Sequence, residues 1–262
     1  MTGDLVRIEG AAFTSSDGVP LKAWRIPGPP GGPGIVLCHD LGSSKDSMLD
    51  LGIALQAAGF TVVGFDFRGH GESGGSGSTL GVAEKRDVLG ALDYLAGVEG
   101  VDVKRLGVYG VGMGAQAAVL AAADRPSAVV LVLDGLYPDA GWEVQRAVYA
   151  RWRFDTQRFG FLPRSVFGAL HFDKRGEAPA SAVLPKLRGR HLLLVAPAGD
   201  APLAAEMQRM YEAIPEQKDA DGNLVTLPAG SGGGLYGEDL TRYRSKVVGF
   251  FTDRLGSAAS PV

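Results

Sequence analysis

Short apolar runs alternate with longer segments of helical spacing along most of the chain. The apolar runs are rich in β-branched residues and predict strands, whereas Lys45 to Ala58, Ala83 to Ala96 and Gly114 to Ala123 have the spacing of helices. The predicted strands are Pro20 to Pro27, Gly34 to Asp40, Thr61 to Phe67, Arg105 to Gly110, Ala128 to Asp134, His191 to Pro197 and Asn223 to Leu227. Continuous apolar strands separated by helices indicate an α/β fold with a parallel sheet that is covered on both faces.

Two stretches depart from this alternation. Residues 138–185 contain seven tryptophan and phenylalanine residues among many arginines, where the alternation predicts only a loop and one helix. We therefore predict a lid-like insertion there. The tail, residues 256–262, is small and polar and is predicted to be disordered. The remaining chain, residues 1–255, is predicted to form a single domain.

Composition narrows the classes of partner. The chain has 262 residues, of which 45% are hydrophobic and 21% are charged, which suffices for one large core. Its formal net charge is −3 and it has no basic block, so nucleic acid and anionic membrane surfaces are not expected as partners.

The sequence contains few features that indicate disulfide bonds, secretion or membrane insertion. Cys38 is the single cysteine and rules out an internal disulfide. The first ten residues lack the layout of a signal peptide, and the run Ala128 to Leu133 is too short to span a bilayer. A soluble, cytoplasmic protein is the prediction.

Four motifs follow the ends of predicted strands. They are HDLGSSKDS after Cys38, DFRGHGESGG after the next strand, GVGMG after Tyr109 and APAGDAPL after Val195. This series resembles the α/β-hydrolase superfamily, in particular its small bacterial esterase-like and peptidase-like members, from about Val19 to Leu255. The resemblance implies an α/β-hydrolase fold, with a mostly parallel central sheet, helices on both faces and residues 138–185 as a small lid insertion.

Two catalytic positions implied by this resemblance are vacant. The superfamily uses a serine at a sharp strand-to-helix turn, then an acid, then a histidine. At the turn, Gly112 stands where the serine is expected. In the loop PAGSGGGLY, Gly232 stands at the histidine position, or Ser231 if the alignment shifts by one residue. We therefore predict that the serine mechanism does not operate, and that the loss was inherited.

The acid position is retained in the sequence. Asp200 follows the strand that ends near Ala196, where the superfamily has its acid, but an Asp in this context equally predicts an N-cap for a helix that begins near Ala201. Asp134 is an alternative acid, and its DGLYP context is equally typical of a turn.

The electrophile-binding half of the site is predicted to survive. The resemblance implies that the backbone N–H groups of Leu41 and Met113 form the oxyanion hole, which would bind a carboxylate or carbonyl oxygen. His39 is expected to support this loop. Asp40 replaces a common glycine, and its side chain either points at the hole or turns outward to cap Ser43 or Ser44; we favour the outward orientation.

The sequence also predicts a cavity at the site and the roles of the cysteine and the remaining histidines. The two glycines should leave a cavity beside the Leu41 and Met113 N–H groups. Cys38 is expected to be buried and inert. The remaining histidines, His70, His171 and His191, favour packing or surface roles. No histidine pair has the spacing of metal ligands, and neither a metal nor a cofactor is predicted.

Three functional hypotheses follow. The first is a pseudoenzyme that binds a small molecule, such as a carboxylate or carbonyl ligand, or a protein partner through the vacated pocket or the lid. The second is an enzyme that acts on an ester, thioester or amide without serine, using Asp200, His171 or a bound water. The third is an ordinary serine hydrolase whose nucleophile lies elsewhere, with Ser165 and Ser181 as candidates.

Overall fold

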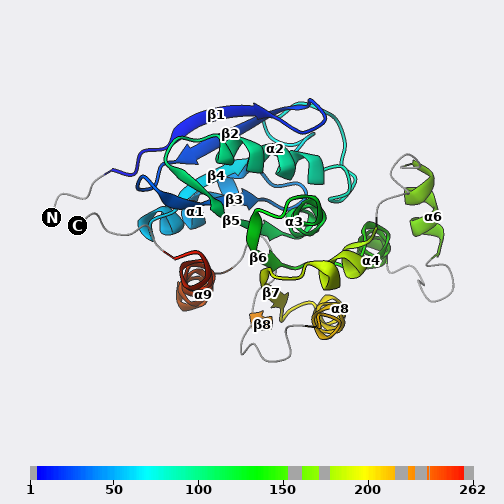
Figure 1. Ribbon diagram of the computed structural model, residues 1–262. Coiled ribbons are helices and arrows are strands. Elements are labelled where there is room, and N and C mark those ends of the chain that lie inside the picture. Colours follow the sequence, from blue (N-terminus) through cyan, green and yellow to red (C-terminus); the bar gives the residue numbers. More distant parts are fainter. Residues whose placement is uncertain are drawn as a thin grey trace.

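An eight-stranded sheet forms the centre of the protein in a computed structural model (Figure 1) that describes residues 5–152, 161–170, 178–215, 224–227, 235 and 237–256. The strand order is β1-β2-β4-β3-β5-β6-β7-β8, in which β1 and β2 run antiparallel and the others are parallel. The strands are β1 (Glu9–Thr14), β2 (Pro20–Ile26), β3 (Gly32–Cys38), β4 (Thr61–Phe65), β5 (Val101–Val111), β6 (Ala128–Asp134), β7 (His191–Pro197) and β8 (Leu224–Leu227). The predicted fold class is confirmed, and each predicted strand is present with slightly shifted ends.

Helices cover both faces of the sheet. One core joins the sheet to α2 (Lys85–Ala96), α3 (Met113–Asp124) and α8 (Ala201–Glu212). A second core, on the opposite face, joins it to the 3-10 helix η1 (Lys45–Met48), α1 (Leu49–Ala57) and α9 (Gly237–Leu255). Every residue of β3 and β4 is buried, which explains why these strands are continuous apolar runs and not alternating ones.

The sheet brings three loops to one edge. β3, β5 and β6 are neighbours and parallel, so their carboxyl ends meet at the same edge. Asp40, Gly112 and Asp134, which follow or end these strands, are thereby placed close together. In open α/β sheets this edge is where ligands bind.

The described part of the segment predicted as an insertion is mostly helical. It contains α4 (Ala140–Trp152), α6 (Phe161–Leu170), α7 (Ala180–Val183) and the 3-10 helix η3 (Leu184–Lys186). α4 lies beside the sheet, and α6 lies farther from the sheet and contacts α4 (Figure 1). Trp142 and Phe167 pack against the core; the side chains of the other five tryptophan and phenylalanine residues, and the tail beyond Gly256, lie outside the described residues. The lid assignment remains a prediction.

No helix in the described part of the chain is both long enough and apolar enough to cross a membrane.

Candidate functional site

A sharp turn joins β5 to α3 at Gly112. Its backbone has φ 51° and ψ −110°, a conformation that glycine adopts at little cost and that L side chains rarely adopt. A Cβ at Gly110 would collide with the backbone of Gly114, and a Cβ at Gly114 would collide with the backbone of Cys38. The three glycines therefore allow the strand, the turn and the first turn of α3 to approach each other closely.

The carboxylate of Asp40 lies directly against this turn. Its Oδ1 accepts hydrogen bonds from the backbone N–H of Leu41 at 2.7 Å and from that of Met113 at 2.8 Å. The outward orientation that we favoured from sequence is therefore wrong. The turn after Asp40 forms without the side chain, because its backbone carbonyl accepts the N–H of Ser43 at 3.1 Å.

Asp40 also fills the space beside Gly112, the position at which the sequence resemblance predicts a serine. A Cβ built on Gly112 would overlap the Asp40 carboxylate, and its three nearest atoms all belong to that carboxylate. Asp40 therefore occupies the space beside Gly112 in which a cavity is predicted from the sequence. Gly232 and Ser231, the two candidates for the histidine position, lie outside the described residues. Their place relative to Asp40 is therefore not described.

Opposing influences act on the ionisation of Asp40. Burial raises the pKa of its carboxyl group above the usual value, while the N–H donors of Met113 and Leu41 and the positive charge of Arg146 lower that pKa. Burial is the larger effect, so the net direction is upward.

Arg146, on α4, links the neighbouring acids. Its Nε and Nη2 donate to the two carboxylate oxygens of Glu143, each at 2.7 Å, and its Nη1 donates to Asp200 Oδ2 at 2.5 Å. Asp200 also caps α8, since its Oδ1 accepts the N–H of Leu203 at 3.1 Å. Capping and ion pairing thus account for the contacts of Asp200; its function as a catalytic acid remains a prediction.

Asp134 lies beneath the turn in a buried polar cluster. Its backbone carbonyl accepts the N–H of Gly112 at 2.8 Å. Its Oδ2 accepts the hydroxyl of Tyr243 at 2.7 Å, and Tyr243 in turn lies 2.6 Å from the hydroxyl of Tyr109. No described residue pairs with Oδ1 of Asp134. Burial raises the pKa of this carboxyl group to about 7.

His39 joins the loops after β3 and β4. It is fully buried, and its Nε2 accepts the N–H of Phe67 at 3.1 Å, so the proton resides on Nδ1, which donates to the carbonyl of Asp40 at 2.7 Å. Burial lowers its pKa to about 4, which keeps the ring neutral.

The described geometry does not place the other candidate reactive groups in the site. Cys38 is buried, and burial raises the pKa of its thiol. His171 lies outside the described residues. Within the described ranges, no three His, Cys, Asp or Glu side chains could together hold a metal ion.

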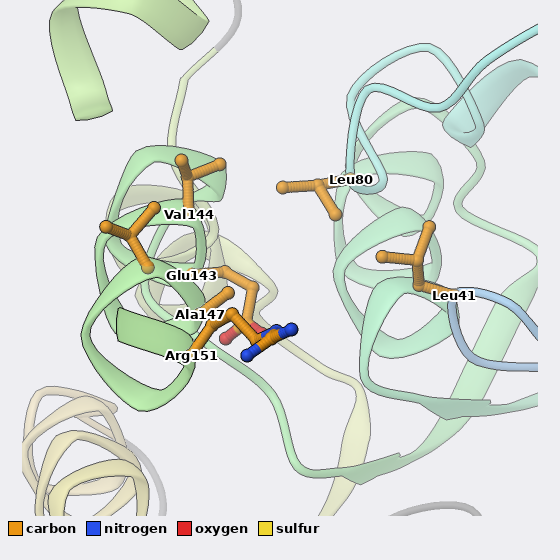
Figure 2. A pocket seen from close by; sticks show the side chains of 7 residues that line it. Leu41, Leu80, Glu143, Val144, Ala147 and Arg151 are labelled. Atoms are coloured by element: carbon orange, nitrogen blue, oxygen red, sulfur yellow. The ribbon is translucent and has the colours of Figure 1, made fainter. Parts of the chain in front are cut away.

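An apolar groove of about 330 Å³ lies beside Leu41, the residue that follows Asp40. Leu41 and Leu80 line one wall, and α4 forms the other (Figure 2). The lining residues from α4 are Glu143, Val144, Ala147, Val148 and Arg151. The motifs did not predict this groove, because α4 contains no superfamily motif and because Leu80 reaches the wall from a long irregular loop.

A comparison with known families assigns the fold. Residues 33–166, more than half of the chain, match the family described as the alpha/beta hydrolase fold. The chain belongs to the α/β-hydrolase fold family.

Relatives and solved structures of this family extend the comparison. An uncharacterised protein of Mycobacterium tuberculosis is 32% identical over 120 residues, which cover 45% of this chain and 42% of that protein, so the chain matches less than half the length of this curated relative. An esterase of Pyrococcus furiosus has a TM-score of 0.70 and 22% identity, covering 98% of this chain and 97% of that one. An α/β hydrolase of a Penicillium species has a TM-score of 0.67 and 16% identity, covering 95% and 99%. At these identities the solved structures show the shared fold alone.

In this α/β-hydrolase fold, the predicted site residues are only partly assembled. Gly112, Met113, Leu41 and Asp40 meet at the turn, with His39 behind them. Asp200 connects to this group through Arg146, which the sequence motifs did not indicate. The one available signal was the spacing of Glu143 and Arg146, which places both on one face of a helix.

Proposed function

We propose that this α/β-hydrolase-fold protein is a cytoplasmic pseudoenzyme that does not hydrolyse esters and instead binds a small molecule in the groove beside its vacated site. The observation that carries this proposal is the Asp40 carboxylate, which accepts both N–H groups that an oxyanion would need. The absence of a serine at Gly112 and of a histidine at Gly232 or Ser231 agrees with it.

Asp40 in the oxyanion hole would lower the rate of ester hydrolysis further than the loss of the nucleophile alone. A substrate carbonyl oxygen could reach the N–H groups of Leu41 and Met113 only by displacing Asp40. Removal of a single oxyanion donor from a serine hydrolase costs about 10²–10³ in kcat, and here both donors are taken.

The negative charge of Asp40 also opposes acyl transfer. An oxyanion that develops near the hole would face the Asp40 carboxylate, and like charges repel strongly in a partly buried site. Protonation of Asp40 would remove the repulsion, but a substrate oxygen would still have to displace the Asp40 side chain from the N–H groups of Leu41 and Met113. The hole is therefore unsuited to acyl transfer in both protonation states.

Asp40 and Gly112 also fit together as a pair. Asp40 occupies the volume that a serine side chain would need, and Gly112 leaves that volume free. Such mutual accommodation supports an inherited loss of catalysis and argues against a single inactivating change.

A second candidate function is an enzyme of the superfamily that acts on an ester, thioester or amide without serine. Its support is Asp40 itself, an ionisable group with a raised pKa beside an open groove. Turnover that depends on Asp40 would favour this candidate over the pseudoenzyme.

Labelling with a fluorophosphonate probe tests the proposed function. We expect the native chain to remain unlabelled, because it has no nucleophile at Gly112. The double variant Gly112→Ser/Gly232→His should also remain unlabelled, because the new side chain at position 112 and the Asp40 carboxylate would compete for the same space. Adding Asp40→Gly to the double variant should restore labelling. The matched control adds Asp46→Gly, an exposed acid in η1, and should stay unlabelled. Labelling of the native chain would overturn the pseudoenzyme, and labelling of the double variant would show that Asp40 does not block the site.

A further inference from the structure

Among the described residues that line the groove between Leu80 and α4, Arg151 is a cation for which no ion pair is found. Of these lining residues, only Glu143 and Arg151 are charged. The Glu143 carboxylate is held by Arg146 through two hydrogen bonds of 2.7 Å. No described residue forms an ion pair with Arg151, whose side chain extends from α4 into the gap that faces Leu41 (Figure 2). The groove is thus apolar along its length and positively charged at Arg151.

The neighbouring groups that bind anions are already occupied. The N–H groups of Leu41 and Met113 hold Asp40, and the carboxylate of Asp40 would repel a second anion there. Arg146 is shared between Glu143 and Asp200. An anionic head group in the groove would therefore find its partner at Arg151 and not at the oxyanion hole.

The wall opposite α4 is built by a strained residue. Leu80 has φ 55°, and it is the one non-glycine residue with positive φ in the described chain. Its carbonyl accepts the hydroxyl of Tyr137 at 2.8 Å, and the next N–H, of Gly81, donates to the buried Glu84 at 2.9 Å. Such strain persists only where the surroundings enforce it, and it is typical of functional sites.

We propose that the groove binds an amphipathic monoanion, with its apolar chain between Leu80 and α4 and its carboxylate on the Arg151 guanidinium. This inference rests on the proposed function, since a working hydrolase would direct the polar head of its ligand into the oxyanion hole. The groove's volume of about 330 Å³ lies at the lower end of the range of about 300–1,000 Å³ for small-molecule sites and suits a medium-chain carboxylate.

Calorimetric titration with decanoate and with decan-1-ol tests this inference on the full chain. The two probes share an apolar chain and differ in the charge of the head. We expect the native protein to bind decanoate more tightly than the alcohol, and Arg151→Gln to weaken decanoate binding by about three- to fivefold without changing that of the alcohol, as expected for an exposed ion pair. The decanoate preference should also shrink at high salt.

Two further variants locate the site. Arg188→Gln removes an exposed arginine at the opposite, amino-terminal edge of the sheet and should leave both affinities unchanged. Ala147→Phe fills the groove from α4 and should weaken both probes.

Several outcomes would overturn the inference. Equal decanoate affinity in the native and Arg151→Gln proteins would remove Arg151 as the anion partner. Tighter binding of the alcohol would indicate a neutral ligand, and no binding of either probe would point to a protein partner on this surface. Neither probe contains an ester bond, so this result is independent of the fluorophosphonate test, which alone decides the proposed function.

Discussion

At the scale of single residues, the site depends on the pairing of Asp40 with Gly112. A side chain at Gly112 would overlap the Asp40 carboxylate, and without that carboxylate the N–H groups of Leu41 and Met113 would lack their present acceptor. Unpaired donors of this kind cost free energy when they are buried. Gly112 therefore leaves room for the Asp40 carboxylate, and this carboxylate supplies the acceptor for the two N–H groups.

Asp134 gives a prediction about pH at the same scale. Its pKa is about 7 in the folded protein, against an ordinary value of 3.8. Because the folded value is raised, the contribution of Asp134 to stability is complete below about pH 3.8 and is lost as the pH rises to about 7. We expect the free energy of unfolding of the native chain to fall across this window relative to that of Asp134→Asn, by at most about 1.4 kcal/mol per pH unit.

Urea denaturation from pH 4 to pH 8 checks this expectation. The exposed Asp253→Asn variant serves as a control and should keep the slope of the native chain. Parallel curves for native and Asp134→Asn would show that the buried cluster does not hold the proton.

The orientation of Asp40 is a residue-scale feature that the sequence could not predict. An Asp in a turn usually bonds to the backbone a few residues ahead, which favoured the outward orientation. The actual orientation depends on an empty volume supplied by Gly112, far along the chain, and on two N–H donors that only the folded sheet brings together.

At the scale of elements, the sequence predicted the buried strands well and the marginal elements poorly. β3, β4 and β6 are nearly continuous apolar runs because both faces are covered. The pattern predicted neither β1 nor α9. β1 is an edge strand that alternates partly buried and exposed residues without an apolar run. In α9, charged residues over the first turns obscure the stripe of buried residues.

The loop that carries Leu80 gives a prediction at this scale. The fully buried Glu84 accepts hydrogen bonds from Ser78 Oγ, from the N–H and Oγ1 of Thr79 and from the N–H of Gly81, all between 2.6 and 2.9 Å. Glu84→Ala would leave two N–H groups without their acceptor. We expect a loss of about 2–4 kcal/mol in the free energy of unfolding, together with weaker decanoate binding as Leu80 loses its position.

Urea denaturation and the decanoate titration measure these effects. Glu212→Ala, an exposed substitution on α8, is the control and should change stability by less than about 0.5 kcal/mol. A Glu84→Ala protein as stable as the control would show that this loop is not held by Glu84.

At the scale of the whole molecule, the hydrolase fold and the hydrolase chemistry are separable. The strand order, the sharp turn at Gly112 and the loops at the carboxyl edge of the sheet place the chain in the α/β-hydrolase fold family, with solved esterases among the proteins that share its fold. Fold alone does not establish activity, which depends on the side chains at the site. In our account, the fold is retained, while the Asp40 carboxylate occupies the N–H groups that would bind the oxyanion of a substrate.

The rate of p-nitrophenyl butyrate hydrolysis by the native protein, measured beside its Asp40→Asn variant, tests this account most directly. The account predicts that both proteins stay at the background rate, because Asp40 blocks the hole and no nucleophile stands at Gly112. Turnover by the native protein at the rate of a working esterase, lost in Asp40→Asn, would contradict it and make Asp40 a catalytic group.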